Sequence, residues 1–181
     1  ALTWALYDQE YEIRRETDPN RNVYLLPDEL KDIDNVEHKF KNNRGDELAG
    51  RYYTLKGSNA PQALIVFAHS FGAGHYPNLA EIRELVKANF AVFAYDATGT
   101  GKSGGEDIVG FPQAVYDLRA ALDYVKTQPD MARLKLGLYG HGWGGYAVTA
   151  ILNEDYPIKA VVDIAGPYSS RASFIEDSKK S

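Results

Sequence analysis

The chain has 181 residues, a length at which a single domain with a sizeable hydrophobic core is expected. Its formal net charge of -5 and its pI near 5.4 argue against nucleic acid as the main partner, and no apolar run approaches the roughly 20 residues of a membrane span. The absence of cysteine excludes disulfides, thiol nucleophiles and thiolate metal sites.

The first part of the chain predicts an extension followed by a hairpin. Residues 1–35 are polar, charged and weakly periodic, and we interpret them as an N-terminal extension. Residues 36–40 and 48–55 alternate between apolar and polar side chains, and a segment containing Asn, Gly and Asp separates them. This pattern is typical of a β-hairpin.

The middle of the chain alternates between apolar strands and amphipathic helices. Strands are predicted at 63–68, 90–95, 135–139 and 159–164, and helices at 77–89, 112–128 and 145–154. Following two antiparallel strands, this series predicts an α/β fold, with a mostly parallel, doubly wound sheet and helices on both faces. We expect residues 36–168 to form this core, and residues 169–181 to form a polar tail or the start of a missing cap or C-terminal part.

A sharp glycine turn between a strand and an Ala-rich helix fits two kinds of site. Gly140, Gly142 and Gly145 match the G-x-G-x-x-G of dinucleotide-binding domains, and Asp163 stands near the usual distance of their ribose-binding acid. The same segment matches the G-x-S-x-G nucleophile elbow, with glycine in place of serine. The motif lies late in the βα series rather than at its start, which disfavours the dinucleotide interpretation.

A second glycine-rich loop follows the strand at 90–95. Residues 96–103 nearly match the phosphate-binding pattern G-x-x-x-x-G-K-[ST], but Asp96 stands at the first glycine position. A carboxylate there would face the phosphate, so the loop disfavours nucleotide binding. No two histidines are spaced as ligands around a glutamate, and we therefore expect no metal and no cofactor.

Three motifs in order resemble the α/β-hydrolase superfamily, in particular its serine esterases and serine-aminopeptidase-like members. The H-G-x-G loop of that family is matched by residues 69–72, with Ser70 in the place of its glycine. Its D-x-x-G-x-G-x-S segment is matched by residues 96–103, and its G-H-S-x-G-G elbow by residues 140–145, with Gly142 in the place of the serine. The resemblance covers nearly the whole chain and implies an α/β-hydrolase fold that is truncated after the sixth strand.

The resemblance also implies a role for each motif residue. Gly142 stands at the nucleophile position, and Phe71 and Trp143 stand where the family has its oxyanion-hole donors. The other motif residues support the elbow and the cleft, and they are His69, Gly72, Gly140, His141, Gly144 and Gly145. The implied parent activity is hydrolysis of a small-molecule ester or amide, or of a peptide, through an acyl-enzyme.

Two departures from the family pattern affect catalysis. Gly142 has no hydroxyl group, and the acid and the histidine of the family follow its seventh and eighth strands, beyond the last strand predicted here. We therefore predict an inactivated and incomplete hydrolase. The alternatives are a natural pseudo-hydrolase that keeps the cleft for binding, and a dinucleotide-binding domain.

The two ends of the chain bear on its partners and its location. A sheet that stops at the sixth strand exposes an apolar edge, so we expect self-association or a missing C-terminal part. Because the chain begins with Ala1 rather than methionine, a removed signal or a membrane anchor upstream of residue 1 is compatible with the sequence. Both a cytoplasmic and an extracytoplasmic location are open.

Overall fold

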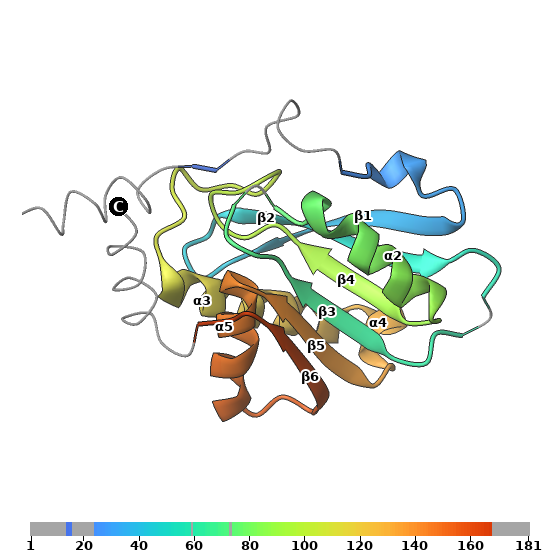
Figure 1. Cartoon of the computed structure of the whole chain (residues 1–181). Helices are drawn as coiled ribbons and strands as arrows, with labels where there is room; N and C mark the ends of the chain where they lie inside the picture. The colour runs from blue at the N-terminus through green and yellow to red at the C-terminus, as the bar shows by residue number, and fades with distance from the viewer. Residues whose placement is uncertain (1–13, 16–23, 59, 73, 168–181) are drawn as a thin grey trace, which may run out of the picture.

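The computed structural model describes residues 14–15, 24–58, 60–72 and 74–167 (Figure 1). The tail predicted at 169–181, and much of the extension predicted at 1–35, lie outside these residues. Within them the chain forms one mixed sheet with helices on both faces, as the sequence predicts.

A sheet of six strands forms the centre of the fold, in the order β1-β2-β4-β3-β5-β6. The strands are β1 (Ile33–Lys41), β2 (Glu47–Leu55), β3 (Leu64–Ala68), β4 (Ala91–Tyr95), β5 (Leu136–His141) and β6 (Ile158–Ile164). β2 pairs antiparallel with both β1 and β4, whereas β4, β3, β5 and β6 run parallel to one another. The predicted hairpin and the mostly parallel order are confirmed.

Helices and short 3-10 turns connect the strands. They are η1 (Pro27–Glu29), η2 (Tyr76–Asn78), α2 (Leu79–Lys87), α3 (Phe111–Thr127), α4 (Pro129–Ala132), α5 (Trp143–Ala150) and η3 (Ile151–Asn153). The helix predicted from residue 145 begins at Trp143, because the turn at Gly142 leads directly into α5. In the described part of the chain, none of the helices has the length and apolar character needed to cross a bilayer.

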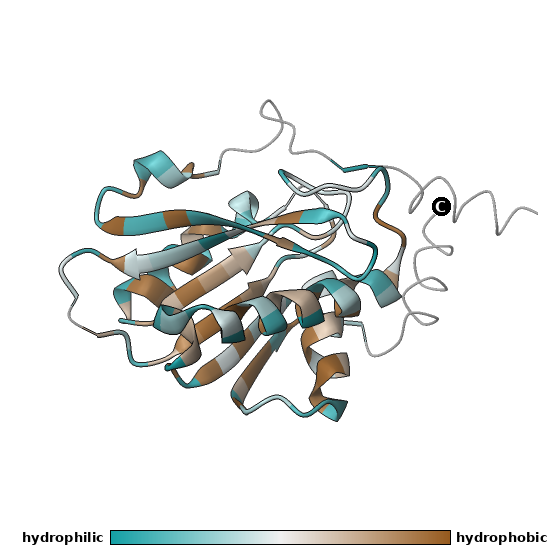
Figure 2. Cartoon of the chain, turned by 180° about the vertical axis from the view of Figure 1, so that it is seen from behind, coloured by the Kyte–Doolittle hydropathy of each residue, from teal (hydrophilic) through white to brown (hydrophobic). Residues whose placement is uncertain are grey.

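The helices cover the two faces of the sheet with separate apolar clusters. α3 and α5 pack on one face, which Figure 2 shows from the α3 side, and α2 packs on the other. β3 and β4 lie between these layers, so Val66 and Phe93 belong to the first cluster, while Phe67 and Val92 belong to the second. Burial on both faces explains why these strands are continuous apolar runs in the sequence.

The packed body begins before residue 36, the predicted start of the core. Leu30 and Ile33 are 3% and 2% exposed, and they pack in the same cluster as Leu79 and Ile82 of α2. β1 accordingly starts at Ile33. A short part of the predicted extension therefore belongs to the α2 layer.

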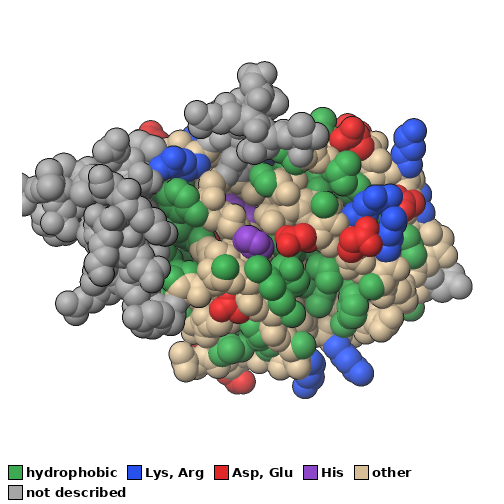
Figure 3. All heavy atoms as spheres, viewed as in Figure 1, with side chains coloured by type: hydrophobic (Ala, Val, Ile, Leu, Met, Phe, Trp, Pro, Cys, Tyr) green, Lys and Arg blue, Asp and Glu red, His purple; other side chains and the backbone are tan. Residues whose placement is uncertain are grey.

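β6 forms the edge of the parallel part of the sheet, and its outer face is partly apolar. Val161 packs in the α5 cluster, so the alternation of a strand places Val162 and Ile164 on the opposite face. These two side chains are 41% and 38% exposed. Figure 3 shows hydrophobic side chains gathered in the lower half of this face. Self-association through this edge stays a prediction.

Candidate active site

The turn between β5 and α5 carries the residue at the predicted nucleophile position. Gly142 has φ 53° and ψ −110°, a conformation that glycine adopts far more readily than other residues. Its N–H donates to the carbonyl of Ile164 at 2.7 Å, and its own carbonyl accepts the N–H of Tyr146 at 3.1 Å. The chain therefore reverses sharply at Gly142, at the carboxyl end of β5.

The other elbow glycines let α5 pack directly against the backbone of the sheet. A Cβ atom at Gly140 would overlap the carbonyl of Gly144, and one at Gly144 would overlap the carbonyl of Ala68. A Cβ atom at Gly145 would overlap the carboxylate of Asp163. Since nothing larger than hydrogen fits at these positions, their glycines are explained by packing.

Gly142 differs from its neighbours in the space that surrounds it. A Cβ atom built there would meet, within 4 Å and among the described residues, only Ser70, whose Cβ lies at 3.3 Å and whose Cα lies at 3.8 Å. Packing of the elbow therefore does not require glycine at position 142. A side chain at this position would point into the space in front of the loop that follows β3.

The loop after β3 is held against the elbow by backbone and side-chain contacts. The N–H of Gly144 donates to the carbonyl of His69 at 3.0 Å. His69 Nε2 accepts the N–H of Ala97 at 3.0 Å, so Nδ1 carries the ring proton and donates to the carbonyl of Ser70 at 2.6 Å. Burial lowers the pKa of His69, which also favours the neutral ring. His69 therefore links the ends of β3 and β4 and is not placed as a general base.

An apolar wall lies beside the elbow. The rings of Phe71 and Trp143 have centroids 5.0 Å apart, and Trp143 stacks on Phe111 with centroids 4.7 Å apart and planes 11° apart. Phe71, Trp143 and the buried Ile108 line a small pocket together with Ser70. The two residues at the predicted oxyanion positions thus lie side by side, while their role as donors stays a prediction.

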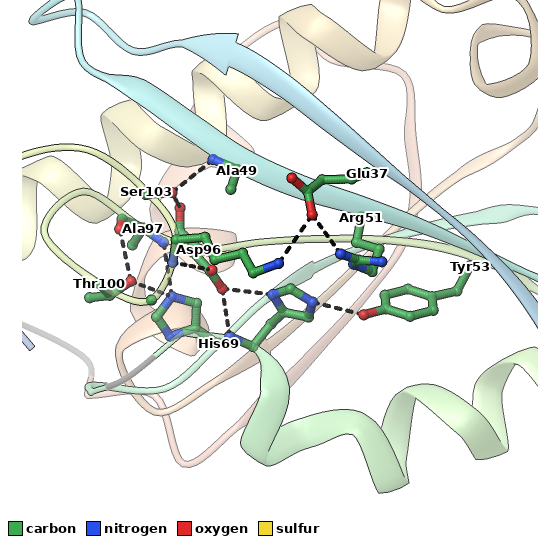
Figure 4. A network of polar contacts seen from close by, with 12 residues as sticks. Glu37, Ala49, Arg51, Tyr53, His69, Asp96, Ala97, Thr100 and Ser103 are labelled. Atoms are coloured by element: carbon green, nitrogen blue, oxygen red, sulfur yellow. Dashed lines mark hydrogen bonds and ion pairs between the residues drawn. The ribbon is translucent and has the colours of Figure 1, made fainter. Parts of the chain in front are cut away.

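A buried polar network lies behind the site, between β2 and the loop 96–105. The Tyr53 hydroxyl and His75 Nε2 are 2.8 Å apart, and His75 Nδ1 lies 2.7 Å from Oδ1 of Asp96. The Asp96 carboxylate also accepts the backbone N–H groups of His75 and Lys102, each at 2.9 Å. Figure 4 shows this chain of contacts from Tyr53 to Asp96. The loop that resembles a phosphate-binding loop is therefore folded around a carboxylate of its own.

The surroundings of Asp96 keep its carboxyl group ionised. Burial alone would raise the pKa of Asp96, but the interactions with His75 and His69 and the hydrogen bond from the N–H of Lys102 outweigh burial and lower it to about 2. Asp96 is 3% exposed and is therefore fully enclosed by the protein. This negative charge accepts the N–H groups of the loop and would repel a phosphate group. The loop is therefore not arranged to bind phosphate.

We expect Asp96→Asn to lower the free energy of unfolding by about 3 kcal/mol at neutral pH, because it leaves buried donors with a neutral partner. The pKa of Asp96 is lower in the folded protein than its ordinary value of 3.8. Its contribution is therefore complete above about pH 4 and is lost as the pH falls towards 2. Urea unfolding of both proteins at several pH values should show the difference shrinking over that interval. Asp34→Asn, at an exposed position of β1, is the control; a pH-independent difference at Asp96 would contradict the expectation.

A second buried network joins the loop to α3 and to the hairpin turn. Asp117 accepts the backbone N–H of Thr98 at 2.7 Å, the hydroxyl of Thr98 at 2.8 Å and the amide of Gln113 at 2.8 Å. The Thr98 hydroxyl oxygen in turn accepts the amide of Asn42 at 2.8 Å. Burial raises the pKa of Asp117 in spite of these hydrogen bonds. The network fixes the floor of the pocket, which Thr98 and Asp117 both line.

A part of the predicted N-terminal extension lies against the same loop. Arg14 donates to three backbone carbonyl groups, those of Gly101, Ser103 and Gly105. The guanidinium of Arg15 lies 5.1 Å from the centroid of the Phe71 ring. The sequence did not predict this contact, because two arginines in a polar segment carry no signal of which distant carbonyl groups they meet.

The structure brings the predicted site residues together at the carboxyl edge of the sheet. Gly72 lines the pocket, and His141 ends β5, with a buried Nδ1 that has no hydrogen-bond partner among the described residues. Sequence reasoning did not predict the contacts of His75 with Tyr53 and Asp96, or that of Asp117 with Thr98, because these partners lie 19 or more residues apart along the chain. In the described residues, no group of three or more histidine and acidic side chains is placed to hold a metal ion.

Known proteins resemble this chain in sequence and in fold. The model of the family described as serine aminopeptidase, S33, matches residues 59–179. Monoglyceride lipase of Rattus norvegicus is 37% identical over 119 residues, which cover 64% of this chain and 37% of the relative. The human monoglyceride lipase is 34% identical over 133 residues, which cover 72% of this chain and 40% of the relative. The chain therefore spans less than half the length of these curated relatives.

A solved structure of the Pyrococcus furiosus esterase Pf2001 has the same fold over most of this chain. The TM-score is 0.73, and the match covers 93% of this chain and 62% of the esterase at 18% sequence identity. An identity this low supports the fold alone. The shared fold agrees with the position of the elbow at the carboxyl end of β5.

Proposed function

The chain belongs to the serine aminopeptidase S33 family of the α/β-hydrolase superfamily, and from this we propose that its cleft binds carboxylic esters or amides as a serine hydrolase does. Two relatives bear the name monoglyceride lipase, so fatty-acid esters of glycerol are the first ligands to test. Because Gly142 has no hydroxyl group, the elbow of this chain does not start an acyl transfer.

The observation that carries the proposal is the contrast between Gly142 and the glycines around it. Gly140 and Gly144 are required by close backbone contacts, whereas a Cβ atom on residue 142 would meet only the side chain and Cα of Ser70 among the described residues, at 3.3 Å and 3.8 Å. An elbow built in this way presents residue 142 to a ligand. On this proposal the site has the backbone turn of a serine hydrolase elbow, with glycine where the family has its serine.

The wall beside the elbow suits an acyl group. Phe71, Ile108, Phe111 and Trp143 form an apolar surface next to residue 142. Apolar burial is the main favourable term when a hydrocarbon chain binds, at about 0.8 kcal/mol for each buried methylene group. An ester with an alkyl chain is therefore a better match to this surface than a polar or charged ligand.

The dinucleotide alternative has less support. Asp163, the candidate ribose-binding acid, accepts the N–H of Gly166 at 2.9 Å and lies against Gly145. It is thus used in the turn after β6. The φ of Gly142 and the short α5 serve a sharp elbow, and the loop at 96–105 is folded around Asp96 instead of a phosphate group.

We expect binding of an ester analogue to change the fluorescence of Trp143, because this ring forms part of the pocket. The ligand is a 1-O-alkylglycerol, an ether that cannot be hydrolysed, and NAD is titrated in parallel. The Trp4→Phe variant removes the other tryptophan, so that Trp143 is the reporter. A saturable change with the ether and none with NAD is expected. Quenching by NAD without a response to the ether would favour the dinucleotide alternative.

A further inference from the structure

A serine hydroxyl group lies beside the elbow, although Gly142 itself has none. Ser70 follows His69 in the loop after β3, and its Cβ lies 3.3 Å from the position of a Cβ atom on residue 142. Ser70 also lines the small pocket with Phe71 and Trp143. The elbow has no hydroxyl side chain, but a serine of the loop after β3 lies next to it.

The hydroxyl group of Ser70 is not used in a hydrogen bond with the described residues. Ser70 is half-buried, and its hydroxyl group has no hydrogen-bond partner among the described residues. Its backbone is nevertheless fixed, because the Ser70 carbonyl accepts Nδ1–H of His69 at 2.6 Å and the preceding carbonyl accepts the N–H of Gly144 at 3.0 Å. A fixed backbone with an unused hydroxyl group facing a pocket is a favourable arrangement for contact with a ligand.

The serines elsewhere near this edge differ from Ser70 in this respect. The Ser103 hydroxyl donates to the carbonyl of Asp96 and accepts the N–H of Ala49 at 2.9 Å, so it is fully used in the loop. The Thr98 and Thr100 hydroxyl groups are likewise hydrogen bonded. Among the described hydroxyl groups that line the pocket, that of Ser70 is available to a bound molecule.

We propose that Ser70 carries the reactive hydroxyl group of this site and accepts the acyl group of a bound ester in place of residue 142. This inference rests on the proposed function. The hydroxyl side chain stands on the loop after β3 instead of on the elbow, and it belongs to a residue that lines the pocket and lies beside residue 142.

The chemical step is an acyl transfer. The Oγ–C bond forms between Ser70 and the carbonyl carbon, the bond from that carbon to the alcohol oxygen breaks, and the hydroxyl proton passes through water to the departing alkoxide. Among the described residues, no basic side chain forms a hydrogen bond with the Ser70 hydroxyl group, because His69 donates through Nδ1 to the Ser70 carbonyl and its Nε2 accepts the N–H of Ala97. Because an unassisted serine is a weak nucleophile, acylation should be slow and should stop at one equivalent.

A fluorophosphonate with an alkyl chain tests the proposal on the full-length wild-type protein. It forms an Oγ–P bond and releases the hydroxyl proton and fluoride as HF, so the product is stable and can be located by peptide mass spectrometry. We expect one adduct, on Ser70, and a modification rate at least about tenfold lower in Ser70→Ala. Ser58→Ala is the matched control, because Ser58 lies outside the pocket and donates to Asn89.

The Ser70→Ala/Gly142→Ser variant separates the two proposals. If the wild type carries no adduct on Ser70 but this variant is modified at position 142, the inference about Ser70 is wrong and the proposed function stands. If neither protein is modified, both the inference and the proposed function fail. Modification of the wild type at Ser70, lost in Ser70→Ala and kept in Ser58→Ala, supports both. Equal modification of the wild type and Ser70→Ala would overturn the inference.

Discussion

The Gly142→Ser variant of the full-length protein is expected to hydrolyse p-nitrophenyl butyrate at least about 100-fold faster than the wild type. The elbow already holds residue 142 at the carboxyl end of β5, beside Ser70, which lines an apolar pocket. The variant adds the hydroxyl group that the family uses as its nucleophile, and removal of such a nucleophile costs several orders of magnitude in rate. In the family, the histidine and the acid that assist this serine follow the seventh and eighth strands, so the variant is tested in a chain that includes them.

Contact with Ser70 decides which companion variants are needed. The introduced Cβ atom lies 3.3 Å from Cβ of Ser70, so the loop after β3 must move by a few tenths of an ångström. We therefore expect Ser70→Gly/Gly142→Ser to be at least as active as Gly142→Ser. Gly142→Ala is the control for the shape of the elbow and should stay at the wild-type rate. Steady-state ester hydrolysis measures all four proteins, and folded but inactive serine variants would count against an esterase site.

We expect Gly144→Ala to be the most destabilising single substitution at the elbow, by about 3 kcal/mol or more. The added methyl group would overlap the carbonyl of Ala68, and neither group can move without displacing a helix or a strand. α5 would be pushed away from β3, which opens the apolar cluster between α3, α5 and the sheet.

Urea denaturation followed by circular dichroism measures this loss. Thr149→Ala, on the exposed side of the same helix, should change the free energy of unfolding by less than about 0.5 kcal/mol. Gly142→Ala should fall between these variants, at about 1 to 2 kcal/mol, because its cost is the backbone conformation rather than an overlap. If Gly144→Ala were as stable as Thr149→Ala, the packing explanation for the elbow glycines would be wrong.

The fold could be predicted because its signals are local in the sequence. The apolar runs of β3 and β4 reflect burial on both faces. The alternating residues of β1 and β2 reflect a hairpin at one edge of the sheet. The bounds were less predictable. α5 begins two residues earlier than predicted, since its first turn is made of glycines whose role depends on contact with β3 and β6.

The site could be predicted in part, from the spacing of its motifs. Glycine patterns located the elbow and the loop after β3, but patterns cannot distinguish a glycine required by packing from one that leaves room, as at Gly144 and Gly142. The Tyr53–His75–Asp96 network could not be predicted, because it joins residues of β2, the start of η2 and the end of β4. The proximity of Ser70 to residue 142 could not be predicted for the same reason, because the two residues lie in different loops that are far apart in the sequence.

The backbone contact between α5 and β3 has an evolutionary consequence. Because Gly140, Gly144 and Gly145 hold the turn, its shape depends little on the side chain at position 142. A lineage can therefore lose or regain a nucleophile by exchanging one amino acid, without having to rebuild the scaffold around it. In such a scaffold, the pocket is retained through evolution, whereas catalytic activity can be lost and regained.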